Sequence, residues 1–66
     1  MHITVNQQPQ QVAEPCSLQQ LVEQLALNPN GLALALNQTV IAKRAWPSTY
    51  LAPEDQVAAF QIVTGG

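Results

Sequence analysis

The first part of the chain has the period of a β-strand. Residues 1–5 alternate between apolar and polar side chains, which is typical of a strand with one buried face. Turn-forming residues 6–9 follow, and residues 10–13 are expected to return as a second strand with Val12 facing inward. Pro15 has no N–H group to give to a sheet, so it ends this strand. The pattern predicts a β-hairpin.

An apolar stripe with helical spacing comes next. Its members, at i, i+3, i+4 and i+7, are Leu18, Leu21, Val22 and Leu25. Ser17 stands at the N-cap position with Gln20 three residues later, which is the spacing of a capping box. Residues 28–31 combine a proline, two asparagines and a glycine, all typical of a helix end. We therefore expect one helix between Ser17 and this segment.

The second half of the chain predicts mainly strands. Residues 32–36 are a compact apolar run, and Asn37-Gln38 predicts a tight turn into a short strand over residues 39–41. Prolines prevent a long element over residues 42–52. The remaining expectations are a turn over residues 51–56 with Pro53 at its second position, a last strand over residues 57–63 and a flexible tail over residues 64–66. The fold class predicted is α+β, as a single two-layer domain over residues 1–66.

The composition of the chain excludes several classes of function. Charged residues make up 9% of the chain, with Lys43 and Arg44 the only basic ones, so no footprint for nucleic acid or an anionic membrane is present. One cysteine and one histidine exclude an internal disulfide and a zinc site of four protein ligands. Residues 1–6 do not resemble a signal peptide, so we expect a cytoplasmic protein. The chain is also too short for an enclosed active site, and its side chains offer no dyad or triad, so we do not expect an enzyme.

The chemistry of the chain is expected at its carboxyl end. Gly65-Gly66 directly follows the last expected strand and could be only a frayed end. From Val63 to Gly66 an extended chain reaches roughly 10 Å, far enough to enter a narrow active site of another protein. Glycine has no Cβ, so a nucleotide can approach its backbone closely. ATP can convert the Gly66 carboxylate into an acyl adenylate, from which a sulfur nucleophile displaces AMP to leave a thiocarboxylate.

Residues along the whole chain carry a resemblance to a known family. The matching segments are Ile3-Thr4-Val5-Asn6, Leu21-Val22-Glu23-Gln24-Leu25, Leu34-Ala35-Leu36-Asn37-Gln38 with Val40, Trp46, Asp55-Gln56-Val57 and Phe60-Gln61-Ile62-Val63-Thr64-Gly65-Gly66. Together they resemble the ThiS family of sulfur carriers in thiamine biosynthesis. The resemblance implies a ubiquitin-like β-grasp fold, which is a mixed sheet of four to five strands with the first and last strands parallel at its centre and one main helix packed on one face. One departure is Glu54-Asp55, where the family often has Gly-Asp.

The resemblance also implies the partners. An E1-like adenylyltransferase of the ThiF type would use ATP to adenylate Gly66, a persulfide donor would supply sulfur, and thiazole synthase of the ThiG type would receive it. Thr64, Gly65 and Gly66 would enter the partners' active sites, and the carrier itself would bind no cofactor and no metal. Phe60, which alternation places on the face opposite to Val57 and Ala59, is expected to dock partners together with Ile62.

Other residues have simpler interpretations. Cys16 precedes the helix and could accept a persulfide, but a small buried residue is the favoured interpretation. Trp46 is expected to have a structural or half-exposed packing role, with a partner contact as the alternative. Lys43 and Arg44 are expected on the surface. The pair Glu54 and Asp55 is expected to form the turn, and His2 to point outward without acting as a ligand or base.

Two alternative functions stay open. A small subunit of molybdopterin synthase would share the fold and the thiocarboxylate, although such proteins tend to be longer. A non-catalytic β-grasp binding module would have a chemically idle carboxyl end.

Overall fold

The computed structural model describes residues 1–61, and residues 62–66 lie outside the described part. Its elements, in chain order, are β1 (His2–Val5), β2 (Gln8–Gln11), α1 (Leu18–Gln24), β3 (Leu32–Leu36), β4 (Thr39–Ile41), the 3-10 helix η1 (Lys43–Ser48) and β5 (Gln56–Gln61). The order of hairpin, helix, hairpin and last strand follows the sequence prediction, whereas the 3-10 helix η1 forms where an irregular stretch was expected.

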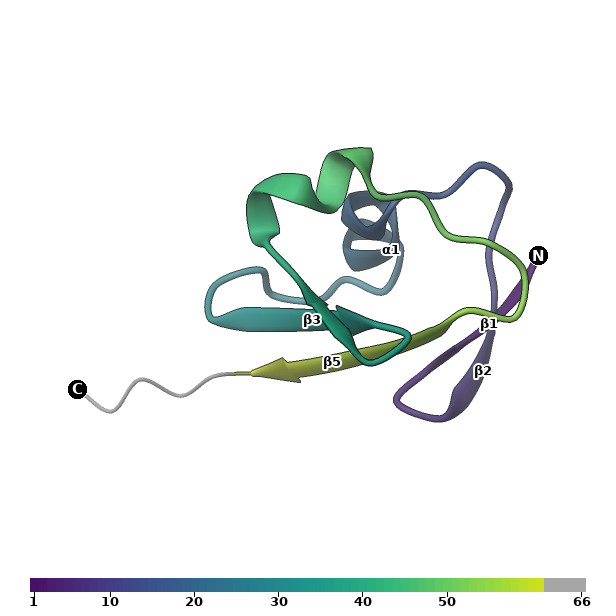
Figure 1. Cartoon of the computed structure of the whole chain (residues 1–66), viewed down its shortest axis with the longest axis horizontal. Coiled ribbons are helices and arrows are strands. Elements are labelled where there is room, and N and C mark those ends of the chain that lie inside the picture. The colour runs from purple at the N-terminus through teal and green to yellow at the C-terminus, as the bar shows by residue number, and fades with distance from the viewer. Residues whose placement is uncertain (62–66) are drawn as a thin grey trace.

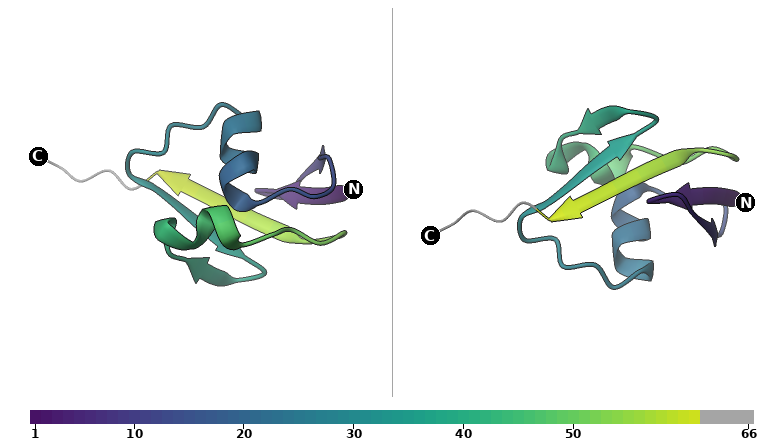
Figure 2. Two further views of the ribbon diagram at one scale, coloured as in Figure 1. Left: turned by 90° about the horizontal axis from the view of Figure 1, so that it is seen from above. Right: turned by 90° about the horizontal axis from the view of Figure 1, so that it is seen from below.

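The described strands form one mixed sheet with β5 in the middle. Their order is β2-β1-β5-β3-β4, and β1 is parallel to β5 whereas the other neighbours are antiparallel. Both α1 and η1 lie on one face of the sheet, and no helix of residues 1–61 covers the opposite face (Figures 1 and 2). The first and last strands are thus parallel neighbours beneath one main helix, which confirms the expected α+β class and β-grasp fold.

Helix α1 begins as predicted and ends earlier than predicted. The Ser17 hydroxyl accepts a hydrogen bond from the Gln20 N–H at 3.1 Å, and the Gln20 side chain accepts one from the Ser17 N–H at 2.9 Å, so the capping box is present. The prediction that residues 28–31 end the helix is wrong. Ala26 has a φ of 55°, its N–H bonds to the Glu23 carbonyl, and the Leu27 N–H bonds to the Val22 carbonyl. This is a Schellman ending with alanine in place of the usual glycine.

The first hairpin turns earlier than predicted. Asn6 and Gln7 have φ values of 51° and 69°, as in a two-residue turn of type I′, so β2 starts at Gln8 instead of at residue 10. Pro9 lies inside β2, which the sheet order makes an edge strand where proline is tolerated. Val12 follows the strand and is buried, as expected of an inward-facing residue. The strand therefore starts two residues earlier than predicted, while Val12 is buried as expected.

The apolar core lies between the sheet and the two helices. Its largest fully buried side chains are Trp46, Ile3, Leu18, Leu21 and Leu34. Trp46 is 1% exposed and its ring N–H donates to the Ile41 carbonyl at 3.1 Å, which confirms its structural role. It reaches the core from η1, which occupies the stretch expected to be irregular and which lies beside α1 (Figure 2). Lys43 and Arg44 are exposed, as predicted.

A tight turn leads into β5. The Asp55 N–H bonds to the Ala52 carbonyl at 3.2 Å, with Pro53 and Glu54 between them and a φ of 71° at Glu54. The Asp55 carboxylate accepts a hydrogen bond from the Ala52 N–H at 2.8 Å, as expected of a turn-forming aspartate. β5 then runs from Gln56 to Gln61; the expected continuation of the strand over residues 62 and 63 lies outside the described residues. No helix within residues 1–61 has the length and apolar character needed to cross a membrane.

Candidate functional site

The candidate site is built on β5, which carries the chain toward its carboxyl end. Val57 is buried beneath the helices, whereas Phe60 lies on the helix-free face and is 47% exposed. The alternation of β5 therefore places Phe60 where the sequence predicted it, and its docking role stays a prediction. Ile62, the second predicted docking residue, lies outside the described residues, as do Thr64, Gly65 and Gly66. The described part of β5 ends on the side of the molecule away from the amino terminus (Figure 1).

Phe60 belongs to an apolar patch on the helix-free face. Residues that pair across strands project to the same face of a sheet, and Phe60 pairs with Ala33 whereas Ala58 pairs with Ala35. Ala35 also pairs with Val40 of β4, which is 70% exposed. We call these five residues the open-face patch: Ala33, Ala35, Val40, Ala58 and Phe60. Val40 was not predicted as part of a docking surface, because its orientation depends on the pairing of β4 with β3.

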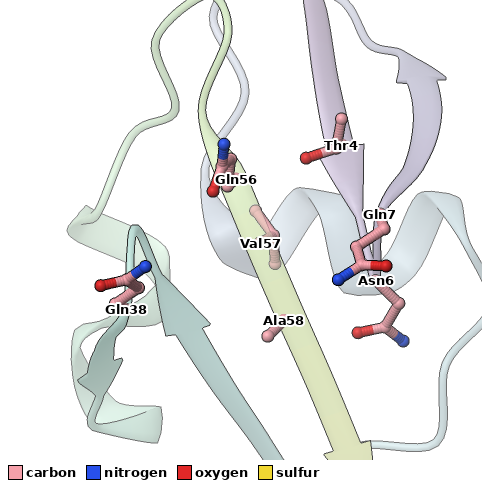
Figure 3. Close-up of a pocket in the computed structure, with 7 residues that line it drawn as sticks. All are labelled: Thr4, Asn6, Gln7, Gln38, Gln56, Val57 and Ala58. Carbon is pink, nitrogen blue, oxygen red and sulfur yellow. The ribbon is translucent and has the colours of Figure 1, made fainter.

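An open groove crosses β5 next to this patch. Its lining consists of Thr4, Asn6, Gln7, Gln38, Gln56, Val57 and Ala58. The turn between β1 and β2 supplies one side of the groove, the turn between β3 and β4 supplies the other, and β5 forms the floor (Figure 3). All polar side chains in the lining are uncharged amides or a hydroxyl. The groove can therefore offer neutral hydrogen bonds but no ionic contact.

Two asparagines hold β5 from opposite sides. On the β1 side, the Asn6 amide donates to the Ala59 carbonyl at 3.1 Å and accepts from the Ala59 N–H at 2.9 Å. On the β3 side, the Asn37 side chain accepts from the Gln56 N–H at 3.0 Å and donates to the Asp55 carboxylate at 3.1 Å. Each asparagine is the first residue of a two-residue Asn-Gln turn with positive φ. Sequence reasoning identified Asn37-Gln38 as a turn, but not the contacts of either asparagine with β5.

Cys16 is not part of this site. Its side chain is 3% exposed and belongs to the core. Burial raises the pKa of the Cys16 thiol, and the positive charge of the amino terminus opposes this only in part. A buried, protonated thiol is a poor nucleophile, so the structure favours the structural interpretation. His2 is exposed on β1, as predicted. Within residues 1–61, no three His, Cys, Asp or Glu residues lie together in a way that could hold a metal ion.

The site thus defines a class of protein: a small β-grasp domain with an apolar patch and a neutral groove on the uncovered face of its sheet. Comparison with known proteins gives the family. The family model described as "ThiS family" matches residues 3–66. The chain is 35% identical to the sulfur carrier protein ThiS of Escherichia coli over 66 residues, which is the full length of both chains. It is also 38% identical over 64 residues to the protein ycf40 of Porphyra purpurea, covering 97% of this chain and 90% of that protein.

A solved structure agrees with these sequence matches. The crystal structure of the thiamine biosynthesis protein ThiS from Geobacter metallireducens superposes with a TM-score of 0.89 at 28% identity, covering all of both chains. The chain belongs to the ThiS family. This membership supports a role as a sulfur carrier in thiamine biosynthesis, in which a small carrier protein works with sulfur-transfer partners.

Proposed function

We propose that this chain acts in the cytoplasm as a single sulfur-carrier domain, and that it carries sulfur as a thiocarboxylate on Gly66 for the thiazole of thiamine. The observation that supports this most strongly is the full-length match to the sulfur carrier of Escherichia coli. The match to the family model also extends to Gly66, so the Gly65-Gly66 end lies within the region of likeness.

The chemistry proceeds in two steps on partner enzymes. An oxygen of the Gly66 carboxylate attacks the α-phosphorus of ATP, bound by an E1-like adenylyltransferase, and pyrophosphate leaves. The terminal sulfur of a donor persulfide then attacks the acyl carbon and displaces AMP. This forms an acyl disulfide between the carrier and the donor. A second thiol of the donor then attacks the donor sulfur and breaks the original persulfide bond, which oxidises the donor to a disulfide and leaves the thiocarboxylate. Thiazole synthase accepts this sulfur.

The folded body contributes recognition. Phe60 is the largest side chain of the open-face patch, and exposed aromatic residues are common anchors in protein interfaces. The neutral groove beside it can bond to a partner's backbone or uncharged side chains. In this proposal, both enzymes dock on the uncovered face of the sheet through Phe60 and Ile62, while Thr64, Gly65 and Gly66 enter their active sites. The carrier needs no cofactor of its own, because the adenylyltransferase binds the ATP.

Intact-protein mass spectrometry tests the proposal. We expect incubation with the adenylyltransferase, ATP and a sulfur donor to exchange one oxygen of the carrier for sulfur at Gly66. Gly66→Ala and deletion of Gly66 should abolish the exchange and leave the unfolding temperature almost unchanged. An unchanged mass for the wild-type chain, with enzymes that load another carrier, would favour the non-catalytic binding module.

A growth experiment separates the two possible sulfur acceptors. If the carrier serves thiazole formation, a strain lacking its gene recovers when thiazole is supplied. Recovery with molybdenum cofactor instead would assign the chain to molybdopterin synthase.

A further inference from the structure

The side chain of Asn6 takes the place of a further residue of β1. The parallel pairing of β1 with β5 matches Thr4 with Gln56 and Val5 with Val57, and the Asn6 N–H bonds to the Val57 carbonyl at 2.9 Å. The chain then turns away into β2, since Asn6 has a φ of 51°. A regular parallel ladder would next use backbone groups to reach Ala59. Here the Asn6 amide makes both bonds itself, at 2.9 Å to the N–H and 3.1 Å to the carbonyl.

Within residues 1–61, these two bonds are the last that reach the backbone of β5 from the β1 side; beyond them, the Gln61 side chain donates to the Asn28 carbonyl at 3.1 Å. The peptide groups of Val57 and Ala59 point toward β1, and those of Gln56 point toward β3, as their hydrogen bonds show. Phe60 and Gln61 follow directly, and their backbone pairing is with Ala33 and Leu32 of β3 alone. Without the Asn6 amide, hydrogen bonding to the backbone of β5 from the β1 side would end at Val57, two residues earlier.

We propose that Asn6 is a positioning residue for the carboxyl end of the carrier: by fixing the backbone of Ala59, it sets the orientation of Phe60 and the point from which the chain continues to Gly66. The inference rests on the proposed function of Gly66. Gly66 is the fifth residue after Gln61, a reach of at most roughly 18 Å when the chain is extended. When the folded body is docked on the adenylyltransferase, so short a connection cannot compensate for a change in the direction of the strand end. A tilt of β5 would therefore move the Gly66 carboxylate away from the nucleotide.

Asn37 provides a matched comparison. It has the same residue type, the same position in an Asn-Gln turn and nearly the same φ, 50°. It also makes two side-chain hydrogen bonds at β5, but to Asp55 and Gln56, where the strand begins. Loss of either side chain removes two hydrogen bonds, whereas only Asn6 acts next to Phe60. The two positions therefore separate a general loss of stability from a loss of positioning.

The experiment compares Asn6→Gly with Asn37→Gly in the full chain. Glycine keeps the left-handed backbone of both turns and removes only the amide. Adenylation is followed as pyrophosphate release by the adenylyltransferase with saturating ATP, at a temperature where unfolding curves show both variants folded. We expect Asn6→Gly to lower kcat/KM by about tenfold to a hundredfold, mainly through kcat, because misplacement of a reacting group by about 1 Å has effects of this size. Asn37→Gly should stay close to wild type despite a similar fall in unfolding temperature.

Hydrogen exchange supplies a readout that does not depend on the enzyme. In Asn6→Gly, the Ala59 amide should exchange at least about tenfold faster than any fall in global stability explains, since it loses its acceptor. In Asn37→Gly, the Gln56 amide should behave in this way while Ala59 stays protected. Equal losses of kcat in the two variants, or a folded Asn6→Gly with wild-type kcat, would overturn the proposal.

A second variant covers the case in which Asn6→Gly does not fold. Asn6→Asp keeps the acceptor for the Ala59 N–H and places an oxygen against the Ala59 carbonyl, so it should lower kcat by a smaller factor; wild-type kcat would again overturn the proposal. If the wild-type chain itself is not adenylated by an active enzyme, the proposed function of Gly66 fails. The exchange of Ala59 then decides whether Asn6 holds the strand end, and unchanged protection there would overturn the positioning role as well.

Discussion

Glu54 occupies a turn position that suits glycine, and its replacement gives a quantitative test. Its φ of 71° lies in the left-handed region, between Pro53 and Asp55 in the turn that leads into β5. A residue with a Cβ loses roughly 1–2 kcal/mol there, while glycine gives up about 0.5–1 kcal/mol of extra chain entropy on folding. Glu54→Gly should therefore stabilise the fold by about 0.5–1 kcal/mol. For a domain of this size, that corresponds to a rise of about 2–8 °C in the unfolding temperature.

Thermal unfolding followed by circular dichroism measures this shift, and Glu54→Ala is the control. The Glu54 side chain is exposed, and its backbone N–H bonds to the His2 carbonyl at 2.7 Å. The alanine variant removes the same carboxylate but keeps the Cβ, so its stability should stay within about 0.5 kcal/mol of wild type. If Glu54→Ala stabilised the fold as much as Glu54→Gly, side-chain charge and not backbone strain would be the cause. A lower unfolding temperature for Glu54→Gly would refute the reasoning outright.

Two further predictions concern single side chains. Phe60→Ala should weaken binding of the adenylyltransferase in calorimetry while destabilising the fold by clearly less than the roughly 3–5 kcal/mol of a fully buried phenylalanine, because Phe60 is 47% exposed; a loss in that higher range would place the ring in the core. Cys16 should react slowly with iodoacetamide at pH 8 in the native state and quickly in urea. Because burial raises the pKa of the folded Cys16 thiol, the unfolded thiol ionises first, so stability is fully present below the thiol's ordinary pKa and falls as pH rises above it. Cys16→Ala should remove this part of the decrease in unfolding free energy at alkaline pH, measured by urea titration. An identical dependence of the unfolding free energy on pH in both chains would contradict this prediction.

The elements that local sequence determines were predicted closely. The start of α1 follows from Ser17 and Gln20, whose side chains bond within one turn of chain. The bounds of β3 and β4 were also predicted, because Asn37-Gln38 is a turn that its own residues favour. The alternation of β5 placed Phe60 opposite to Val57 and Ala59, although that the helix covers the Val57 face was an assumption, which the structure confirms. In each case the information lies within a few residues of the feature.

The errors arose where tertiary packing prevailed over local preference. Alanine at position 26 gives no sign of a helix end, yet the chain takes a left-handed turn there and Leu27 packs against the core. Pro9 suggested a turn, but an edge strand accepts a residue without an N–H, so β2 includes it. Both outcomes depend on tertiary contacts of the segment, which the local sequence pattern does not indicate.

The candidate site was predictable only in part, for the same reason. The contact of Asn6 with Ala59 joins residues 53 positions apart, and no local sequence pattern predicts it. Val40 joins the open-face patch through the register of β4 with β3, which had to be known before its exposure could be interpreted. The role of the Gly65-Gly66 end stays a prediction: its proposed chemistry belongs to the backbone, and both residues lie outside the described part of the chain.

The neutrality of the open face constrains how partners can bind there. The patch around Phe60 is apolar, and the polar side chains of the neighbouring groove are uncharged. Complexes formed without electrostatic steering typically associate at about 10⁵–10⁶ M⁻¹s⁻¹, and differences in their lifetime come mostly from dissociation. Phe60 and Val40 are the exposed large side chains of the patch, and Ala35 is buried, so the patch offers little apolar area to bury, which favours rapid release. In the proposed function, a carrier that leaves the adenylyltransferase before it reaches the sulfur acceptor needs such release. We therefore expect selectivity to come from joint engagement of the patch and the Gly66 end rather than from either alone.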